Sequence, residues 1–167
     1  MTIDIQAIAT STPDDWAFFQ GLNKVQAVNS PDDDDTSWIF SNGSNNQQQY
    51  YLDTNSIPPG STINSVSIRS RSRDNVPNNQ TFHCSLILGI NSSDGPVHAT
   101  GQTGYSTFTD TIARPGGGAW SLLDLTTLEE RITTDNANSS NILLTSLWLI
   151  VDYTPPAQAT GAMLLVF

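Results

Sequence analysis

Apolar and polar residues alternate along much of the chain, and this alternation predicts β-strands rather than helices. In residues 63–73, Val66 and Ile68 fall on one face, and Arg69, Arg71 and Arg73 fall on the other. Residues 82–90 repeat the pattern, with one apolar face formed by Phe82, Cys84, Leu86, Leu88 and Ile90. The alternation therefore indicates strands with one buried face each.

Other segments extend this prediction over most of the sequence. Shorter strands are expected at residues 37–40 and 50–52, and a Thr-rich extended stretch covers residues 97–112. Residues 142–153 are apolar on both faces, which is typical of a central strand that is covered from both sides. Pro and Gly mark turns between the strands, most clearly at residues 57–60.

One segment predicts a helix. Ser121 is placed as an N-cap with Asp124 three positions later, and an apolar stripe follows at helical spacing. The stripe consists of Leu122, Leu125, Leu128 and Ile132. We therefore expect a short α-helix over about residues 121–133.

These elements predict an all-β fold, an antiparallel β-sandwich of jelly-roll type with one short α-helix. We expect a single domain in which residues 1–20 form an N-terminal arm or short capping segment and residues 21–156 form the sandwich. Residues 157–167 are expected to be an apolar C-terminal strand or tail. The tail either packs in the chain's own core or contacts another subunit.

Composition and charge narrow the class of partner. The 167 residues include six Lys plus Arg against sixteen Asp plus Glu, which gives a net charge of -10. This sign disfavours nucleic acid and anionic membranes as partners. An acidic balance also fits a need for solubility alone. The first residues lack the pattern of a secretory signal, so we expect synthesis in a cytoplasm.

Candidate catalytic and metal-binding residues are few. The run Asp32, Asp33, Asp34 and Asp35 could bind a cation, but it lacks the spacing of a known calcium loop and also fits a solvated turn. Cys84 lies in an apolar stripe, which favours a core position over a nucleophile. Neither His83 nor His98 has a catalytic motif around it. We therefore expect no enzyme activity and no cofactor.

The arginine stripe is the strongest candidate for a binding site. Arg69, Arg71 and Arg73 bring three of the chain's arginines to one strand face of an acidic protein. Arginine is enriched at protein interfaces, so the stripe predicts contact with a neighbouring subunit or an acidic partner. The alternative is internal charge neutralisation, with Asp32 to Asp35 as candidate partners. The chain ends complete the predicted interface through Ile3, Ile5, Met163, Leu165 and Phe167.

Several segments together resemble a family of structural proteins from tailed bacteriophages. The resemblance covers roughly residues 30–156 and rests on four motifs that turns, caps and alternation also explain. The motifs are Asp34-Asp35-Thr36-Ser37-Trp38-Ile39; Ile57-Pro58-Pro59-Gly60 through Ile63, Val66, Ile68, Arg71 and Arg73; Arg114-Pro115, Gly118, Trp120-Ser121, Asp124-Leu125 and Leu128-Glu129; and Val151, Tyr153 and Pro155. The N-terminal segment and the tail after Pro156 depart from the pattern.

The resemblance implies a β-sandwich of the phage virion. We expect a capsid decoration (cement) protein that binds the major capsid protein or other virion subunits as a homo-oligomer, most simply a trimer. An alternative is a tail- or fibre-associated module that binds host glycans, with Trp38, Tyr50, Tyr51, Tyr105 and Trp120 as candidate aromatics. Outward-facing aromatics would favour this alternative. Trp38 and Phe40 share a face by alternation and are expected in the core. A hydrolase that uses paired carboxylates is a third hypothesis.

Overall fold

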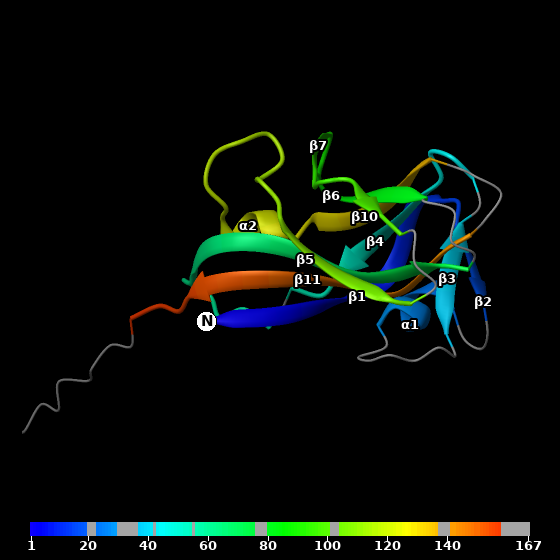
Figure 1. The fold of residues 1–167 in the computed structure, drawn as a ribbon. Coiled ribbons are helices and arrows are strands. Elements are labelled where there is room, and N and C mark those ends of the chain that lie inside the picture. Colours follow the sequence, from blue (N-terminus) through cyan, green and yellow to red (C-terminus); the bar gives the residue numbers. More distant parts are fainter. Residues whose placement is uncertain are drawn as a thin grey trace, which may run out of the picture.

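The computed structural model describes residues 1–19, 23–29, 37–41, 43–54, 56–75, 80–100, 104–136 and 141–157. In this part of the chain the predicted antiparallel β-sandwich is confirmed (Figure 1). The strands are β1 (Thr2–Asp14), β2 (Ala17–Phe19), β3 (Trp38–Ser41), β4 (Gln47–Leu52), β5 (Thr62–Asp74), β6 (Thr81–Leu88), β7 (Asn91–Asp94), β8 (His98–Ala99), β9 (Ser106–Thr111), β10 (Leu128–Asn136) and β11 (Ile142–Thr154). The helices are α1 (Lys24–Val28) and α2 (Leu122–Leu125).

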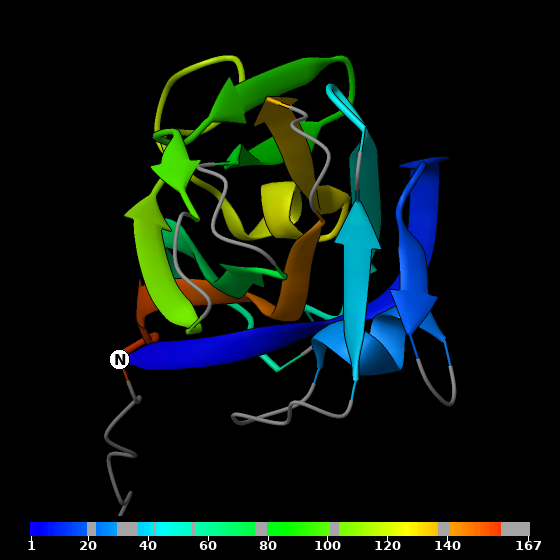
Figure 2. The same cartoon turned by 45° about the vertical axis from the view of Figure 1, so that its right-hand side comes forward.

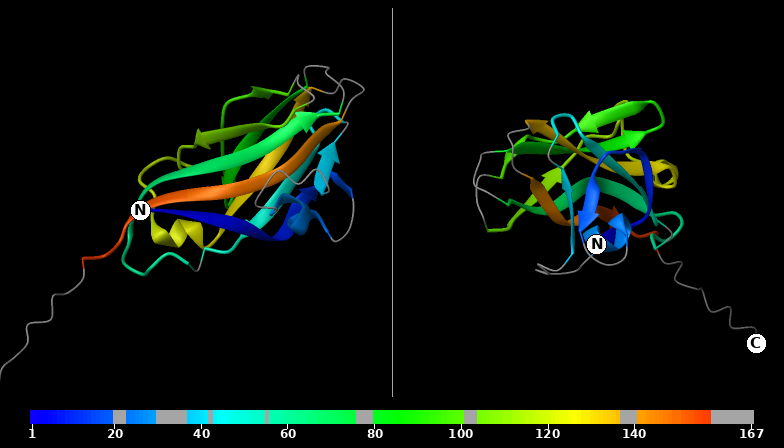
Figure 3. Two further views of the ribbon diagram at one scale, coloured as in Figure 1. Left: turned by 60° about the horizontal axis from the view of Figure 1, so that its bottom comes forward. Right: turned by 90° about the vertical axis from the view of Figure 1, so that its right-hand side faces the viewer.

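Strand β11 lies at the centre of the first sheet, which we call sheet A. One edge of β11 pairs with β5 along nearly its whole length. The other edge is shared, because β3 pairs with residues 142–144 and β1 with residues 148–152. Strand β9 then extends the sheet beyond β5, and β2 extends it beyond β3. Figure 3 shows β5, β11 and β1 lying side by side.

Strand β1 joins the two sheets. Its residues Thr2 to Gln6 pair with β11, whereas the residues from Ala7 onward pair with β4, with register shifts between Ala7 and Ala9 and between Ser11 and Asp14. The second sheet, sheet B, continues from β4 through β10 and β6 to β7 and β8. Figure 2 shows β1 passing along the base of the sandwich and then turning upward. The expected N-terminal arm over residues 1–20 is therefore wrong for β1, which is an integral strand.

Ile3 and Ile5 explain why this segment is a strand. They stand in register with Val151 and Leu149, which are fully buried on the inner face of β11. Ile5 is itself only 2% exposed and belongs to the hydrophobic core, and Ile3 packs against that core. Both residues were expected at an interface with another subunit, but they pack within the chain's own sandwich instead. Burying their apolar side chains there makes a strand more favourable than a free arm.

Helix α1 fills the gap that opens in sheet A where β1 leaves β11. Asn23 caps the helix by accepting a hydrogen bond from the backbone of Gln26 (2.9 Å). Ala27 and Val28 are buried in the core. The sequence pattern did not predict this helix, because five residues are too few to establish a helical stripe.

The helix predicted over residues 121–133 is correct only in its first turn. Ser121 caps α2 as expected, but the helix ends after Leu125 and strand β10 begins at Leu128. Leu128 and Ile132 are four residues apart, a spacing that fits both a helical turn and strand alternation. In β10 both side chains face the core, and Ile132, Thr133 and Thr134 are β-branched residues that favour a strand.

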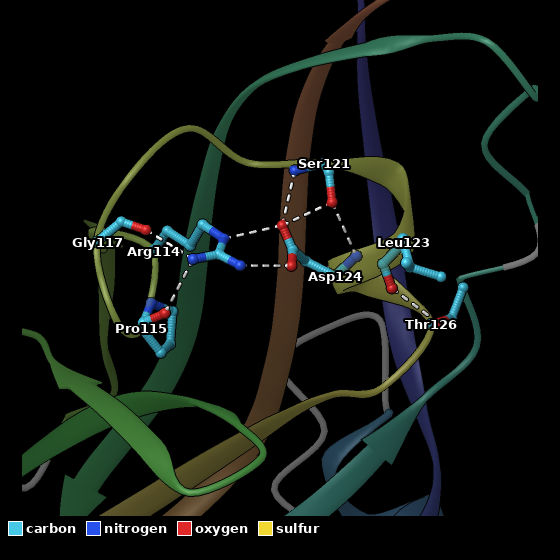
Figure 4. Close-up of polar contacts among 7 residues, drawn as sticks. All are labelled: Arg114, Pro115, Gly117, Ser121, Leu123, Asp124 and Thr126. Atoms are coloured by element: carbon cyan, nitrogen blue, oxygen red, sulfur yellow. Dashed lines mark hydrogen bonds and ion pairs between the residues drawn. The ribbon is translucent and has the colours of Figure 1, made fainter.

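An arginine–aspartate clamp closes the loop before α2 (Figure 4). Arg114 donates through Nε to Asp124 Oδ2 (2.9 Å) and through Nη2 to Asp124 Oδ1 (2.8 Å). Asp124 also accepts a hydrogen bond from the backbone of Ser121, which completes a capping box. A third Arg114 nitrogen, Nη1, donates to the carbonyl of Gly117 (2.6 Å). This motif, which carries part of the phage resemblance, therefore has a structural role in the fold.

Replacing the clamp carboxylate tests that role. Asp124→Asn removes the charge that Arg114 and the capping box share, and so replaces two charge-assisted hydrogen bonds from Arg114 by weaker contacts. We expect a lower melting temperature by calorimetry at pH 7. Hydrogen bonds from Arg114 hold the pKa of Asp124 well below its usual value of 3.8. The wild-type advantage should therefore be present above that pH and shrink as the pH falls below it.

Leu123→Ala in the same helix is the matched control, since the Leu123 side chain is 77% exposed. It should change the melting temperature little. Equal stability of Asp124→Asn and the wild type at pH 7 would contradict the structural role of the clamp.

Candidate binding surfaces

The arginine stripe of β5 lies on the outer face of sheet A. The Arg69 guanidinium stacks over the Trp148 ring at 4.3 Å from the ring centroid, and its Nη2 donates to Asp4 Oδ2 (3.0 Å). Arg71 and Arg73 both lie over the Tyr105 ring, at 4.2 Å and 4.8 Å. We call Arg69, Arg71, Arg73, Tyr105 and Trp148 the arginine face.

The two-sided pattern predicted for β5 is confirmed. Val66 and Ile68 are buried in the core, whereas the three arginines are partly exposed on the opposite side. Asp4 neutralises Arg69, so one part of the internal-neutralisation alternative holds, although with Asp4 rather than with the predicted run. Asp32, Asp33, Asp34 and Asp35 lie outside the described residues. Aromatic rings thus lie against all three guanidinium groups, and Arg71 also donates to the Thr145 hydroxyl (3.3 Å).

Aromatic residues of β2 and β3 continue the arginine face toward the edge of sheet A. The Phe19 and Trp38 rings stack with centroids 4.4 Å apart, and Phe19 is 43% exposed. Phe40 stands in register with Leu143, which in turn stands in register with Arg73. Leu143 is buried but lies outside the main core cluster, as does Trp148. The outer face of sheet A therefore carries a second, smaller apolar patch.

The expected core position of Trp38 and Phe40 is wrong. They share a face as alternation predicts, but both are only partly buried on the outer side. Ile39, between them, is fully buried and supplies the core contact of β3. Alternation defines two faces without stating which one is inside.

The remaining predicted interface residues are separated from this surface. Ile3 and Ile5 face the core from β1, as described above. Met163, Leu165 and Phe167 lie outside the described residues, so their role stays a prediction. Within the described ranges, no group of three or more His, Cys, Asp or Glu residues could hold a metal ion.

Both histidines lie within hydrogen-bonding distance of aspartates on other strands. His83 Nδ1 lies 2.6 Å from Asp135 Oδ1, and its Nε2 lies 4.0 Å from Asp94 Oδ1. Ser85 donates to the same Asp94 oxygen (2.8 Å), so its hydroxyl is directed at a carboxylate rather than at the imidazole. His98 Nε2 lies 2.7 Å from Asp110 Oδ2. These pairs join residues of different strands and were not visible as sequence motifs.

Glu129 and Glu130 are adjacent in β10 and point to opposite faces of the strand. Glu129 accepts a hydrogen bond from Gln49 Nε2 (2.8 Å) on the outer face. Glu130 is fully buried, and neither carboxylate oxygen has a hydrogen-bond partner among the described residues. Burial raises the pKa of Glu130 to about 8. Burial, together with the nearby Glu130, raises the pKa of the neighbouring Tyr50.

Cys84 is confirmed as a buried core residue. Burial, together with the nearby Glu130, raises the pKa of its thiol well above the ordinary value. The thiolate that nucleophilic chemistry requires is therefore disfavoured. The two helices of the described part span five and four residues, and neither is long enough to cross a membrane.

Comparison with known proteins gives fold-level likenesses only. No family model and no curated protein matches the chain. Among solved structures, it is similar to the CBM36-1 domain of a multidomain xylanase from the hindgut metagenome of Trinervitermes trinervoides, with 11% identity, 93% of this chain and 100% of that chain covered, and a TM-score of 0.47. The Agl-KA catalytic domain has 11% identity and a TM-score of 0.46, with 97% of this chain and 29% of that chain covered.

The Stig cyclase Fisc from Fischerella sp. TAU is a third similar structure, with 10% identity, 90% of this chain and 84% of that chain covered, and a TM-score of 0.45. At these identities and TM-scores none of the likenesses carries an argument about function. None of the comparisons links the chain to tailed phages, so that resemblance stays a sequence prediction.

The buried Glu130 predicts a pH-dependent stability. Its folded-state pKa of about 8 lies above the ordinary value of 4.5, so the folded chain holds a proton that the unfolded chain releases between these values. The contribution that protonated Glu130 makes to the free energy of unfolding is fully present below pH 4.5 and is lost as the pH rises through about 8. Glu130→Gln should remove this loss, giving a flatter plot of melting temperature against pH between 5 and about 9.

Glu129→Gln is the matched control for the Glu130 variant and should keep the wild-type slope, because its carboxylate lies on the outer face. Parallel curves for Glu130→Gln and the wild type would show that Glu130 does not titrate as its burial implies.

Proposed function

We propose that the chain is a non-catalytic structural module that docks on a protein surface through its arginine face, in the role of a capsid decoration protein on a phage head. The observation that carries the proposal is the stacking of Arg69, Arg71 and Arg73 on Trp148 and Tyr105 outside the core. The phage context comes from the sequence resemblance.

The chemistry of the arginine face supports a protein partner. Arginine, tryptophan and tyrosine are the residues most enriched at the centres of protein interfaces. Stacking on a ring holds each guanidinium in place, so less side-chain freedom is lost when it binds a carboxylate. The single lysine, Lys24, pairs with Asp14 away from this face.

Charge supports an acidic docking surface on the partner. The chain carries a net charge of -10, yet three of its six basic residues stand on one face of one strand. An acidic partner surface would be attracted to this face and repelled by the remainder of the molecule, which orients the encounter. Copies arranged by symmetry on a shell would multiply weak contacts into stable attachment.

The glycan-binding alternative loses most of its aromatic candidates. Tyr50 is fully buried, and Trp120 packs against the core. Tyr105 is covered by two guanidinium groups, and Trp38 is stacked on Phe19. A ring used in this way offers a sugar less free surface, which favours protein docking as the role of the arginine face.

The proposal is tested on tailed-phage particles from the source of the sequence. Cryo-electron microscopy of these particles should show density for this sandwich on the outside of the head, with the arginine face toward the shell. Heads without such density, in particles whose other structural proteins are complete, would reject the decoration role.

Charge reversal tests the arginine face directly. The double variant Arg71→Glu/Arg73→Glu should bind heads assembled without the chain at least tenfold more weakly than the wild type, because each reversal turns attraction into repulsion. Co-sedimentation with such heads measures the affinity. Arg71→Lys/Arg73→Lys keeps the positive charges but loses the planar guanidinium groups, which can make two parallel hydrogen bonds to a carboxylate. This variant should therefore bind with intermediate affinity.

A control variant adds negative charge elsewhere. Gln26→Glu/Ile90→Glu changes two exposed residues, one in α1 and one in the turn after β6, and should bind like the wild type. Equal binding by the charge-reversal variant and this control would rule out the arginine face as the docking surface.

A further inference from the structure

The outer face of sheet B carries an ordered array of polar side chains that the proposed docking role does not use. Strand alternation brings residues 47, 49 and 51 of β4 to this face, together with residues 129, 131 and 133 of β10. Register then sets them in rows across the sheet. Tyr51 stands opposite Glu129, Gln49 opposite Arg131, and Gln47 opposite Thr133. We call Gln49, Tyr51, Glu129, Arg131 and Thr133 the polar face.

The polar face extends onto β6 through the same register. Arg131 stands opposite Ser85, and Thr133 stands opposite His83. The Gln49 amide donates to Glu129 Oε2 and so orients that carboxylate across the strands. Asp135 holds the imidazole of His83 in the same way. Side-chain hydrogen bonds therefore fix the direction of several groups on this face before anything binds.

Two polar atoms of the polar face are buried without a protein partner. Thr133 is only 5% exposed, and its hydroxyl has no hydrogen-bond partner among the described residues. The Nε of Arg131 is likewise buried without a partner in that part of the chain. Leaving a buried polar atom unpaired costs free energy, which a ligand with matching donors and acceptors would recover.

Tyr51 gives the polar face an aromatic surface. Its ring is 47% exposed, whereas its neighbour Tyr50 is completely buried in the core. An exposed tyrosine ring offers an apolar surface with a polar tip. A pyranose ring has the complementary chemistry, because one of its faces is rich in C–H groups and its rim carries hydroxyls. Such hydroxyls both donate and accept, as the mixture of amide, carboxylate, guanidinium and hydroxyl groups here requires.

The carboxylates on and around the polar face favour a neutral carbohydrate over an anionic one. Glu129 lies within the polar face, and Asp94 and Asp135 flank it through their contacts with His83. A sialylated or sulfated glycan would meet these carboxylates on a chain of net charge -10. A neutral glycan avoids that repulsion.

We propose that the polar face binds a neutral carbohydrate, with a sugar ring stacked on Tyr51 and sugar hydroxyls bonded to Glu129, Arg131 and Thr133. This site goes beyond the proposed docking role and uses the opposite sheet of the sandwich (Figure 3, right). The two surfaces can therefore be occupied at the same time, which would suit a module that is attached through one face and displays the other.

The first experiment presents the purified chain to an array of neutral, sialylated and sulfated glycans at high surface density, where multivalency reveals weak binding. We expect binding to a set of neutral glycans. Binding restricted to anionic glycans, or to none on the array, would overturn the proposal.

The second experiment measures affinity for the best neutral glycan by titration calorimetry. Tyr51→Ala should weaken binding at least tenfold. Thr133→Val keeps the shape of the side chain but removes the hydroxyl, and should weaken binding several-fold. Thermal melts of both variants establish that they fold. Unchanged affinity in both folded variants would overturn the site even if the chain binds glycans.

A matched control separates this site from the arginine face. Arg71→Glu/Arg73→Glu lies on the other sheet and should bind the glycan as the wild type does. If that variant alone loses glycan binding, the sugar is held on sheet A and the polar face is excluded. Failure of the docking proposal leaves this result unaffected, because the glycan assay contains no virion component.

Discussion

The pairing of β11 with strands on both of its edges constrains how the other strands of sheet A are arranged. Residues Ile142 to Leu149 are buried without interruption, so this strand must be covered on both faces and paired on both edges. Each fully buried Leu or Ile contributes roughly 1.5–3 kcal/mol relative to an exposed one, which makes this strand a dominant source of stability. Strand β5 occupies one edge, but the other is divided between β1 and β3.

That division determines the remaining topology. Because β3 pairs with the start of β11, β1 pairs with β11 only as far as Gln6 and from Ala7 onward pairs with β4 of sheet B. Helix α1 fills the resulting gap, where Asn29 donates to the carbonyl of Ala7 (2.7 Å) and bridges to Ser146. One long strand thus ties both sheets together, and the sandwich presents two outer faces of different chemistry.

The sequence was most informative where structure follows from local alternation. The strands of residues 63–73 and 142–153 and the buried Cys84 were predictable because every second side chain meets the same environment. Alternation could not show which side of β3 faces the core. It also could not separate a helix from a strand at Leu128 and Ile132, since a spacing of four fits both.

The candidate sites illustrate the same limit. The arginine stripe was visible within one strand, whereas its ring partners Trp148 and Tyr105 come from elsewhere in the chain. The polar face was not predicted, because Arg131 and Thr133 fall within the helix that was expected over residues 121–133. Their alignment with Gln49 and His83 depends on the register of β4, β10 and β6, which is a long-range property.

Hydroxyl-radical footprinting of the free chain and of the chain attached to phage heads would identify the face that docks, because oxidation reports the exposure of individual aromatic side chains. We expect attachment to protect Phe19, Trp38 and Tyr105, beside the arginines of sheet A, while Tyr51 on sheet B stays as reactive as in the free chain. Protection of Tyr51 with unchanged oxidation of the other three would contradict this expectation.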